Sequence, residues 1–176
     1  MGVTCTASGL KQLILLADTN IIIDLAQVDS LNLLPSIAPT EILDIVLQEC
    51  YHPKQPDLIH AIRKSNIQVV ESDIKWGEDI ENIKIQSNYA LSFVDSGNLY
   101  YAREQSRTLL TGDKALRDMC QRHNVDYHGS IWLLEQAHRN QYLPPMELCQ
   151  WIQIWMRTGR YLPKKELLAL QKMLGC

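Results

Sequence analysis

The chain has 176 residues, of which 46% are hydrophobic and 21% are charged, and its formal net charge at pH 7 is -3. This composition is typical of a soluble globular domain with a sizeable core, and no apolar run approaches the roughly 20 residues of a membrane span. Proteins that hold nucleic acid by charge alone are usually basic, so this acidic chain would need bound cations to handle nucleic acid.

The first half of the chain alternates short apolar runs with helical patterns. The continuous apolar run 13–17 predicts a strand that is covered on both faces. Asp18-Thr19-Asn20 follows it, and these residue types favour the start of a helix, which we expect to continue to Ala26. Further strands are expected at 41–43 and 67–71, and further helices at 44–50, from Pro56 to about residue 62, and at 74–87.

The second half continues this alternation as far as residue 140. We expect helices at 95–105, 113–120 and 129–140, and strands at 108–111 and 125–127. Strands that alternate with helices predict an α/β fold with a mainly parallel sheet and right-handed crossovers.

The tail follows a different pattern, because its apolar residues repeat only at helical spacing. Trp151 and Trp155 belong to this repeat, and we expect both to be packed. The predicted organisation is a flexible leader at 1–12, one α/β domain at 13–142, and a C-terminal helical hairpin at 143–176 that packs on the same domain.

The cysteines show no pattern of a disulfide framework or a zinc site. They are odd in number and widely spaced, without a C-x-x-C pair: Cys5, Cys50, Cys120, Cys149 and Cys176. The sequence therefore predicts reduced thiols in a cytoplasmic protein.

Four acidic residues stand where an α/β fold places its functional sites. Asp18 and Asp113 directly follow predicted strands, Asp95 begins a helix, and Glu49 lies about one helical turn beyond Asp44. Because sites form at the carboxyl ends of parallel strands, we expect these carboxylates to converge. Clustered carboxylates repel one another unless a cation lies between them, and oxygen ligands select Mg²⁺ or Mn²⁺. The alternative is that each aspartate only caps a helix.

The acidic segments together resemble the PIN domain. The resemblance rests on Leu16-Ala17-Asp18-Thr19-Asn20 with Asp24-Leu25, on 44–49, on Val94-Asp95-Ser96-Gly97-Asn98 and on 110–117. Their order and spacing both match the family, and 128–134 is similar to its last strand and helix.

The resemblance implies a Rossmann-like parallel sheet flanked by helices and a carboxylate pocket that binds Mg²⁺ or Mn²⁺. Carried over by position, the metal-binding and catalytic residues are Asp18, Glu49, Asp95 and Asp113. Asn20 and Thr111 would support this pocket, and Glu41 or Asp44 remain open as replacements for Glu49. The C-terminal helical pair is similar to an extension of toxin-related PIN proteins.

Basic side chains near the predicted pocket are candidates for contacts with phosphate. Arg103, Lys114 and Arg117 lie on the helices that follow Asp95 and Asp113, where they either line the rim or form a solvated helix face. The basic cluster of the tail, Arg157, Arg160, Lys164 and Lys165, either contacts RNA or flanks a turn.

The resulting hypothesis is a Mg²⁺- or Mn²⁺-dependent endoribonuclease that hydrolyses RNA phosphodiester bonds. By resemblance it is the cytoplasmic toxin of a toxin–antitoxin pair, with a small antitoxin protein and a second copy of itself as expected partners, and with no membrane association. The alternative is a binding or scaffold module that keeps the fold without turnover.

Overall fold

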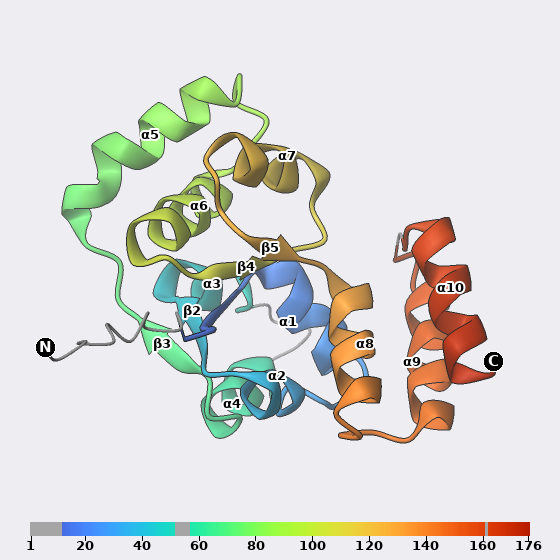
Figure 1. Ribbon diagram of the computed structural model, residues 1–176. Helices are drawn as coiled ribbons and strands as arrows, with labels where there is room; N and C mark the ends of the chain where they lie inside the picture. The colour runs from blue at the N-terminus through green and yellow to red at the C-terminus, as the bar shows by residue number, and fades with distance from the viewer. Residues whose placement is uncertain (1–11, 52–56, 161) are drawn as a thin grey trace, which may run out of the picture.

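The computed structural model describes residues 12–51, 57–160 and 162–176 (Figure 1). It contains a five-stranded sheet in the order β3-β2-β1-β4-β5, in which every pair of neighbouring strands is parallel, as predicted. The strands are β1 (Leu15–Ala17), β2 (Thr40–Leu43), β3 (Gln68–Val70), β4 (Thr108–Leu110) and β5 (Tyr127–His128). Of the sequence-based expectations, the leader up to residue 11 and the helix start at Pro56 lie outside the described residues.

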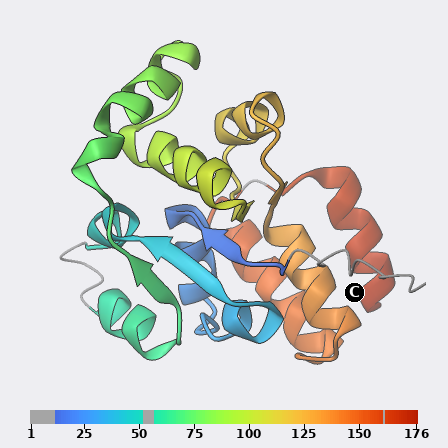
Figure 2. The same cartoon turned by 60° about the vertical axis from the view of Figure 1, so that its left-hand side comes forward.

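Helices cover both faces of the sheet. Those of the α/β body are α1 (Thr19–Ala26), α2 (Leu33–Ile37), α3 (Asp44–Glu49), α4 (Asp57–Lys64), α5 (Gly77–Gln86), α6 (Phe93–Gln105), α7 (Lys114–Arg122) and α8 (Ser130–Arg139). In Figure 1, α5, α6 and α7 lie above the sheet, and α2 and α4 lie below it. In the rotated view of Figure 2 the arrows of β1, β2 and β3 run in the same direction, as their parallel pairing requires.

The strand order reverses beside β1, which is the feature that positions the site. The chain leaves β1 toward β2 and β3 on one side, and it later returns to place β4 and β5 on the other. Ala17, the last residue of β1, is in register with Leu110, the last residue of β4. Ligands of open parallel sheets bind beyond the carboxyl ends of the strands at such a reversal. The residues that follow Ala17 and Leu110 therefore lie where an open parallel sheet binds its ligand.

The three residues of β1 form the centre of the core. Leu15, Leu16 and Ala17 are each 0% exposed, which agrees with the prediction of a strand covered on both faces. An entirely apolar strand loses stability if either face is uncovered, because each buried leucine contributes about 1.5–3 kcal/mol. This packing fixes the direction in which the chain leaves β1.

Three helical segments differ most from the sequence-based expectation. The helix α6 begins at Phe93, not at residue 95, because Ser92 is its N-cap and accepts a hydrogen bond from the amide of Asp95. The segment predicted as one helix at 74–87 is a 3-10 turn at Ile74–Trp76 followed by α5. The short helix α2, which contains a proline, was not predicted, since five residues carry too little periodicity.

The C-terminal hairpin consists of α9 (Pro145–Arg157) and α10 (Lys164–Leu174), which lie beyond α8 in Figure 1. Trp151 and Trp155 are 3% and 0% exposed, so the prediction that both are packed is confirmed. The indole Nε1 of Trp155 donates a hydrogen bond of 2.9 Å to the backbone oxygen of Asp24 in α1. The hairpin is thereby fastened to the helix that starts at the sheet edge.

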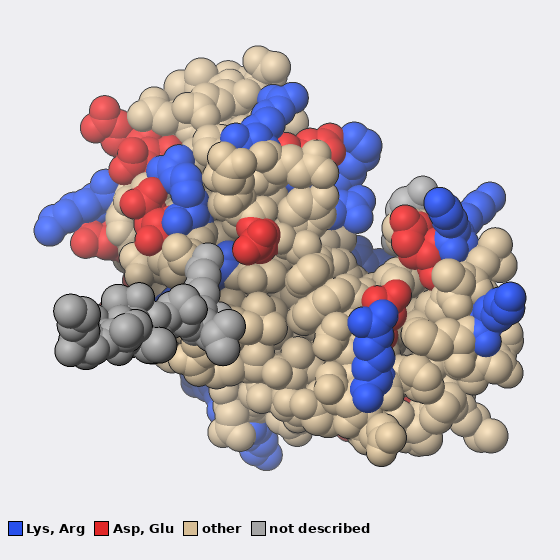
Figure 3. Space-filling view, viewed as in Figure 1, with Lys and Arg blue, Asp and Glu red and all other residues tan. Residues whose placement is uncertain are grey.

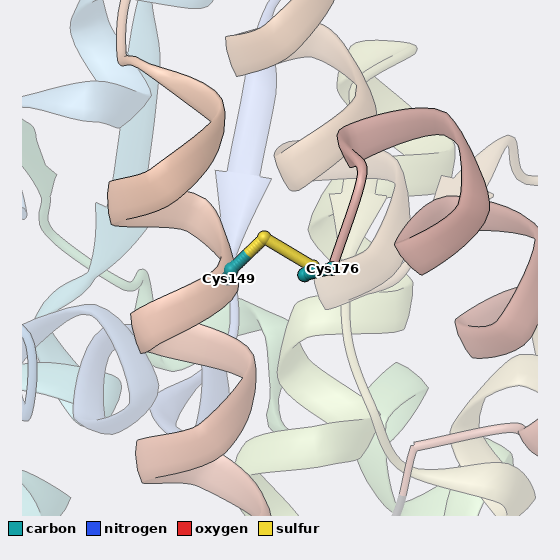
Figure 4. The surroundings of a disulfide bond; sticks show 2 residues. All are labelled: Cys149 and Cys176. Carbon is teal, nitrogen blue, oxygen red and sulfur yellow. A yellow bond between two sulfur atoms is a disulfide. The ribbon is translucent and has the colours of Figure 1, made fainter.

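The expectation that all thiols are reduced is wrong for two of them, because Cys149 and Cys176 form a disulfide (Figure 4). The antiparallel helices α9 and α10 bring the start of one beside the end of the other, so the two Cα atoms lie 6.1 Å apart. A sequence separation of 27 residues does not reveal this juxtaposition. Cys50 and Cys120 are buried free thiols.

Within the described part of the chain, no helix is long and apolar enough to span a membrane.

Candidate active site at the carboxyl edge of the sheet

Asp18 stands directly beyond β1 and is the centre of the candidate site. Its side chain caps α1 by accepting a 2.7 Å hydrogen bond from the amide of Thr19. The residue is nevertheless only 2% exposed, unlike an ordinary capping residue at the surface. Its second oxygen, Oδ2, accepts hydrogen bonds from the hydroxyl of Thr111 at 2.8 Å and from the side-chain amide Nδ2 of Asn20. Asp18 is therefore both a cap and a buried carboxylate held by neighbouring side chains.

The electrostatic surroundings of Asp18 disfavour its negative charge. The pKa of Asp18 is raised from 3.8 to about 7, mainly by burial and also by the charges of Asp95 and Glu49. The hydrogen bonds from Thr111 and Thr19 act in the opposite direction and lower this pKa. In the part of the chain that the structure describes, no lysine or arginine forms an ion pair with Asp18. The carboxylate thus lies in a position that attracts a proton or a cation.

Glu49 and Asp95 approach Asp18 from two different helices. Glu49 ends α3 and is exposed, and its Oε2 accepts a 2.6 Å hydrogen bond from the hydroxyl of Thr19. Asp95 lies in the first turn of α6 and is half-buried, and its Oδ2 accepts a 3.0 Å hydrogen bond from the amide of Ser92. Because both charges act on Asp18, these three carboxylates share one electrostatic environment.

Asp113 occupies the rim of this arrangement. It is exposed and caps α7, with its Oδ1 accepting a 2.8 Å hydrogen bond from the amide of Leu116. Its own amide donates to the hydroxyl of Thr111 at 3.1 Å, and that hydroxyl donates to Asp18. The structure thus connects Asp113 to Asp18 through Thr111.

Asn20 and Thr111, the predicted supporting residues, belong to one network with Asp18. Asn20 donates to Asp18 through Nδ2 and accepts a 3.0 Å hydrogen bond from the amide of Gly112 through Oδ1. Thr111 is 0% exposed, so its hydroxyl has no access to solvent. The turn after β4 is in this way held against the turn after β1.

Asn98 stands in one of the segments that carry the resemblance, but the sequence-based reasoning did not count it as a site residue. Its side chain is 0% exposed, and Nδ2 lies 3.4 Å from Asp18 Oδ1. Its Oδ1 is buried without a hydrogen-bond partner among the described residues, which is unfavourable for a polar atom. The one available signal was its position on α6, three residues after Asp95 and therefore on the same helical face.

The glycine before Asn98 explains how α6 comes so close to the site. A Cβ atom on Gly97 would lie 2.8 Å from Ile45 Cδ1 of α3, which is too close for an unshifted contact. The absence of a side chain lets α6 approach α3, and this places Asp95 and Asn98 beside Asp18.

Glu41 and Asp44, the alternatives to Glu49, are engaged elsewhere. Glu41 is buried and forms an ion pair with Arg107, whose Nε lies 2.8 Å from Glu41 Oε2. Asp44 accepts hydrogen bonds from the amide of Ile45 at 2.8 Å and from the amide of Ser72 at 3.1 Å. The geometry therefore favours Glu49 as the third carboxylate near Asp18.

The predicted rim cations differ in their surroundings. Arg103 pairs with Glu104 at 2.9 Å, and Lys114 pairs with Asp118 at 2.7 Å, both on their own helices. Arg117 is half-buried and lines a cleft of about 450 Å³ together with Gly112. Of the three, Arg117 is the one that faces a concave surface beside the site.

The donor set fits a hard divalent cation in its chemistry. Asp18, Asp95 and Glu49 offer carboxylate oxygens, and the partnerless Oδ1 of Asn98 is a neutral oxygen donor next to them. Among the described residues, no three acidic, histidine or cysteine side chains are already arranged as a metal-binding group. Ion binding would therefore require side chains at this edge to rotate.

Comparison with known proteins identifies relatives of the chain. A family model described as PIN domain matches residues 14–175, which include the C-terminal hairpin. The crystal structure of PAE2754 from Pyrobaculum aerophilum is similar, with a TM-score of 0.52 and 16% identity over 72% of this chain and 98% of that one. At this level of identity the likeness shows the fold alone. No curated protein matches the chain.

Proposed function

The chain belongs to the PIN-domain family, whose members are generally nucleases that use divalent metals, and on this premise we propose that it hydrolyses RNA phosphodiester bonds with Mg²⁺ or Mn²⁺. The observation that carries the proposal is the buried carboxylate of Asp18, which faces two further carboxylates and has no cationic partner among the described residues. A site that only caps helices has no need to bury an acid at this cost.

Each side chain of the network has a distinct part in this proposal. Asp18, Asp95 and Glu49 would hold the cation, with Asp113 at the rim. When bound there, a divalent cation supplies charge neutralisation at the phosphate and lowers the pKa of a water molecule that attacks it. Thr111 and Asn20 donate hydrogen bonds to Oδ2 of Asp18, and they would fix the orientation of its carboxylate in the site.

The preference for RNA and the physiological setting rest on the resemblance to toxin-related PIN proteins. We propose that the protein is a cytoplasmic toxin of a toxin–antitoxin pair, held inactive by a small antitoxin protein and able to form a homodimer. Co-expression with the protein encoded next to it, followed by a cleavage assay on the purified complex, tests this setting.

The deciding experiment for the site compares metal binding and cleavage in the same samples. Mn²⁺ is titrated by calorimetry into the wild type, Asp95→Asn and the control Glu104→Gln, and each protein is incubated with a structured RNA and a DNA of the same sequence. Asparagine at position 95 keeps an oxygen for the amide of Ser92, so the helix start is preserved.

We expect the Asp95→Asn variant to lose both metal binding and cleavage, and Glu104→Gln to keep both. Cleavage of DNA with RNA left intact would replace the proposed substrate. A wild type that binds no Mn²⁺ would overturn the metal-dependent mechanism and favour a scaffold module.

A further inference from the structure

A second feature lies next to the acidic network, between the α/β body and the C-terminal hairpin. It is the cleft of about 450 Å³ that Arg117 lines, and its walls come from the turn after β4, from β5 and α8, and from Arg160, Leu162 and Pro163 between α9 and α10. Figure 3 shows the surface hollowed between α7 and the hairpin, with Lys or Arg side chains in and around the hollow. This volume lies within the range of small-ligand sites.

Arg160 lines this cleft, and an ion pair with Asp24 anchors its guanidinium there. Its Nε lies 2.6 Å from the Oδ1 of Asp24, a carboxylate that is itself 1% exposed. Its Nη2 lies 3.4 Å from the backbone oxygen of Asn20, and Ser130 holds the other oxygen of Asp24 at 3.1 Å. A guanidinium carries five N–H donors, so donors remain after these contacts. An anchored arginine with free donors is well suited to bind phosphate.

The cleft also adjoins the candidate active site directly. Gly112 is shared, because its amide donates to Asn20 in the acidic network while the residue itself lines the cleft. A Cβ atom on Gly112 would lie 3.2 Å from Arg160 Nη2 and 3.4 Å from Asn20 Oδ1. Arg160 and the network around Asp18 thus both approach the same glycine.

An aromatic surface forms another wall of the cleft. The rings of His128 and Trp132 are stacked, with centroids 4.1 Å apart and an interplanar angle of 4°. Both are half-buried and both line the cleft. Flat aromatic surfaces beside basic groups are what single-stranded nucleic acids bind, since bases stack on the rings and phosphates pair with arginine.

The charge of the walls distinguishes between classes of ligand. Glu135 and Glu166 line the cleft together with Arg117 and Arg160, so the lining is not strongly positive. A small free anion gains little from such a mixed lining. A nucleotide suits it better, because its phosphate pairs with arginine while its base can donate hydrogen bonds to carboxylates.

We propose that this cleft binds one nucleotide of the RNA strand adjacent to the cleavage point, with its phosphate on Arg160 and Arg117 and its base against Trp132. The inference rests on the proposed function, because it assumes that the acidic network acts on RNA. It assigns a substrate-binding role to the C-terminal hairpin, which supplies Arg160.

The test measures RNA binding without cleavage. A fluorescein-labelled single-stranded RNA of ten nucleotides is titrated with each protein in EDTA, and anisotropy gives the affinity at several KCl concentrations. The proteins are the wild type, Arg117→Gln, Arg160→Gln and Trp132→Leu. The matched control is Arg63→Gln, which removes an exposed arginine of α4 that is not among the lining residues of the cleft.

We expect Arg117→Gln and Arg160→Gln each to weaken binding about tenfold, as the loss of one charge-assisted hydrogen bond implies. Each should also lower the slope of log affinity against log salt by about 0.7, the value for one phosphate contact in a single strand. Trp132→Leu should weaken binding about fivefold or more through lost stacking while the salt slope stays unchanged. Arg63→Gln should match the wild type.

Several results would overturn the inference. Wild-type affinity in Arg117→Gln and Trp132→Leu would place the RNA elsewhere, even if Arg160→Gln is unstable and uninformative. An equal loss in Arg63→Gln would show that general charge, and not the cleft, binds RNA. A parallel cleavage assay with Mn²⁺ separates the two proposals: cleavage by a wild type whose RNA binding ignores the cleft variants leaves the proposed function intact and removes this one.

Discussion

Asp18, directly after β1, and Glu41, on the neighbouring strand β2, are two buried carboxylates with opposite surroundings. Glu41 of β2 pairs with both guanidinium nitrogens Nε and Nη2 of Arg107, at 2.8 and 3.0 Å, and accepts the hydroxyl of Tyr101 at 3.0 Å. Asp18 accepts only neutral donors and faces two further carboxylates. The charge of Glu41 is neutralised by a cation within the fold, and the charge of Asp18 is not.

This difference separates a structural acid from a candidate functional one. In a buried ion pair with complete hydrogen bonding the charge is already compensated. An unpaired buried carboxylate is unfavourable until it binds a proton or a cation. Asp24 also has a cationic partner in Arg160, but unlike Glu41 its hydrogen bonding is incomplete, because its Oδ1 has no hydrogen-bond partner among the described residues. The comparison predicts that acids of the two kinds respond differently to neutral substitution, to pH and to metal.

The largest difference should appear in cleavage. We expect Asp18→Asn to lower the cleavage rate by about 1000-fold, because a metal site contributes several kcal/mol to the transition state. Glu41→Gln should keep its rate within about threefold once unfolded protein is subtracted, since Glu41 only pairs with Arg107. Single-turnover cleavage of a labelled RNA with saturating Mn²⁺ measures both. Equal losses in the two variants would abolish the distinction.

The next difference concerns stability and its dependence on pH in EDTA. The folded-state pKa of Asp18 is raised from 3.8 to about 7, so ionisation destabilises the fold progressively between these values. Asp18→Asn should therefore be more stable than the wild type by up to about 4 kcal/mol above pH 7, and by progressively less toward pH 4. Urea unfolding at several pH values tests this. A variant that is less stable than the wild type at pH 8 would contradict it.

Glu41→Gln should have the opposite effect on stability and make the fold less stable than the wild type. Removing this charge leaves Arg107, whose side chain is 21% exposed, without its partner. We expect a loss of about 2 kcal/mol, less than for a fully buried pair because water reaches the arginine. The double variant Glu41→Gln, Arg107→Met should recover part of the loss. Thermal unfolding of the set measures this, and a neutral Glu41→Gln would mean that the ion pair contributes nothing.

The smallest effect should come from the neutral donor that orients Asp18. Thr111→Val keeps the shape of the buried side chain and removes the hydroxyl that donates to Asp18 at 2.8 Å. Since that hydrogen bond lowers the pKa of Asp18, its loss should raise the pKa and weaken Mn²⁺ binding by about 10-fold. Calorimetry at pH 7 and pH 8 reports it, with Thr108→Val as the control. Unchanged affinity would show that Thr111 has a packing role only.

Much of this arrangement could be predicted from the sequence, because it depends on local order along the chain. The apolar run before Asp18 indicates a buried strand, and an acid directly after such a strand lies at the edge where parallel strands end. The same reasoning placed Asp113 beside β4. These predictions need only the order of elements, which the alternating pattern supplies.

The rest depends on contacts between segments that are distant in sequence. Asn98 becomes a partner of Asp18 through the packing of α6, where Gly97 faces Ile45 of α3. Arg160 pairs with Asp24 across 136 residues of chain, so its place in the basic tail said nothing about its partner. The bond between Cys149 and Cys176 likewise depends on how α9 and α10 pack.

That bond has a consequence for the hairpin as a whole. With Cys149 joined to Cys176, the intervening segment is a closed covalent ring, and Arg160 is one of its members. A closed ring has fewer unfolded conformations than an open chain. The disulfide therefore limits the unfolded conformations of the turn that carries Arg160. The thiol–disulfide balance of the surroundings would thereby govern how firmly the guanidinium is held at the cleft.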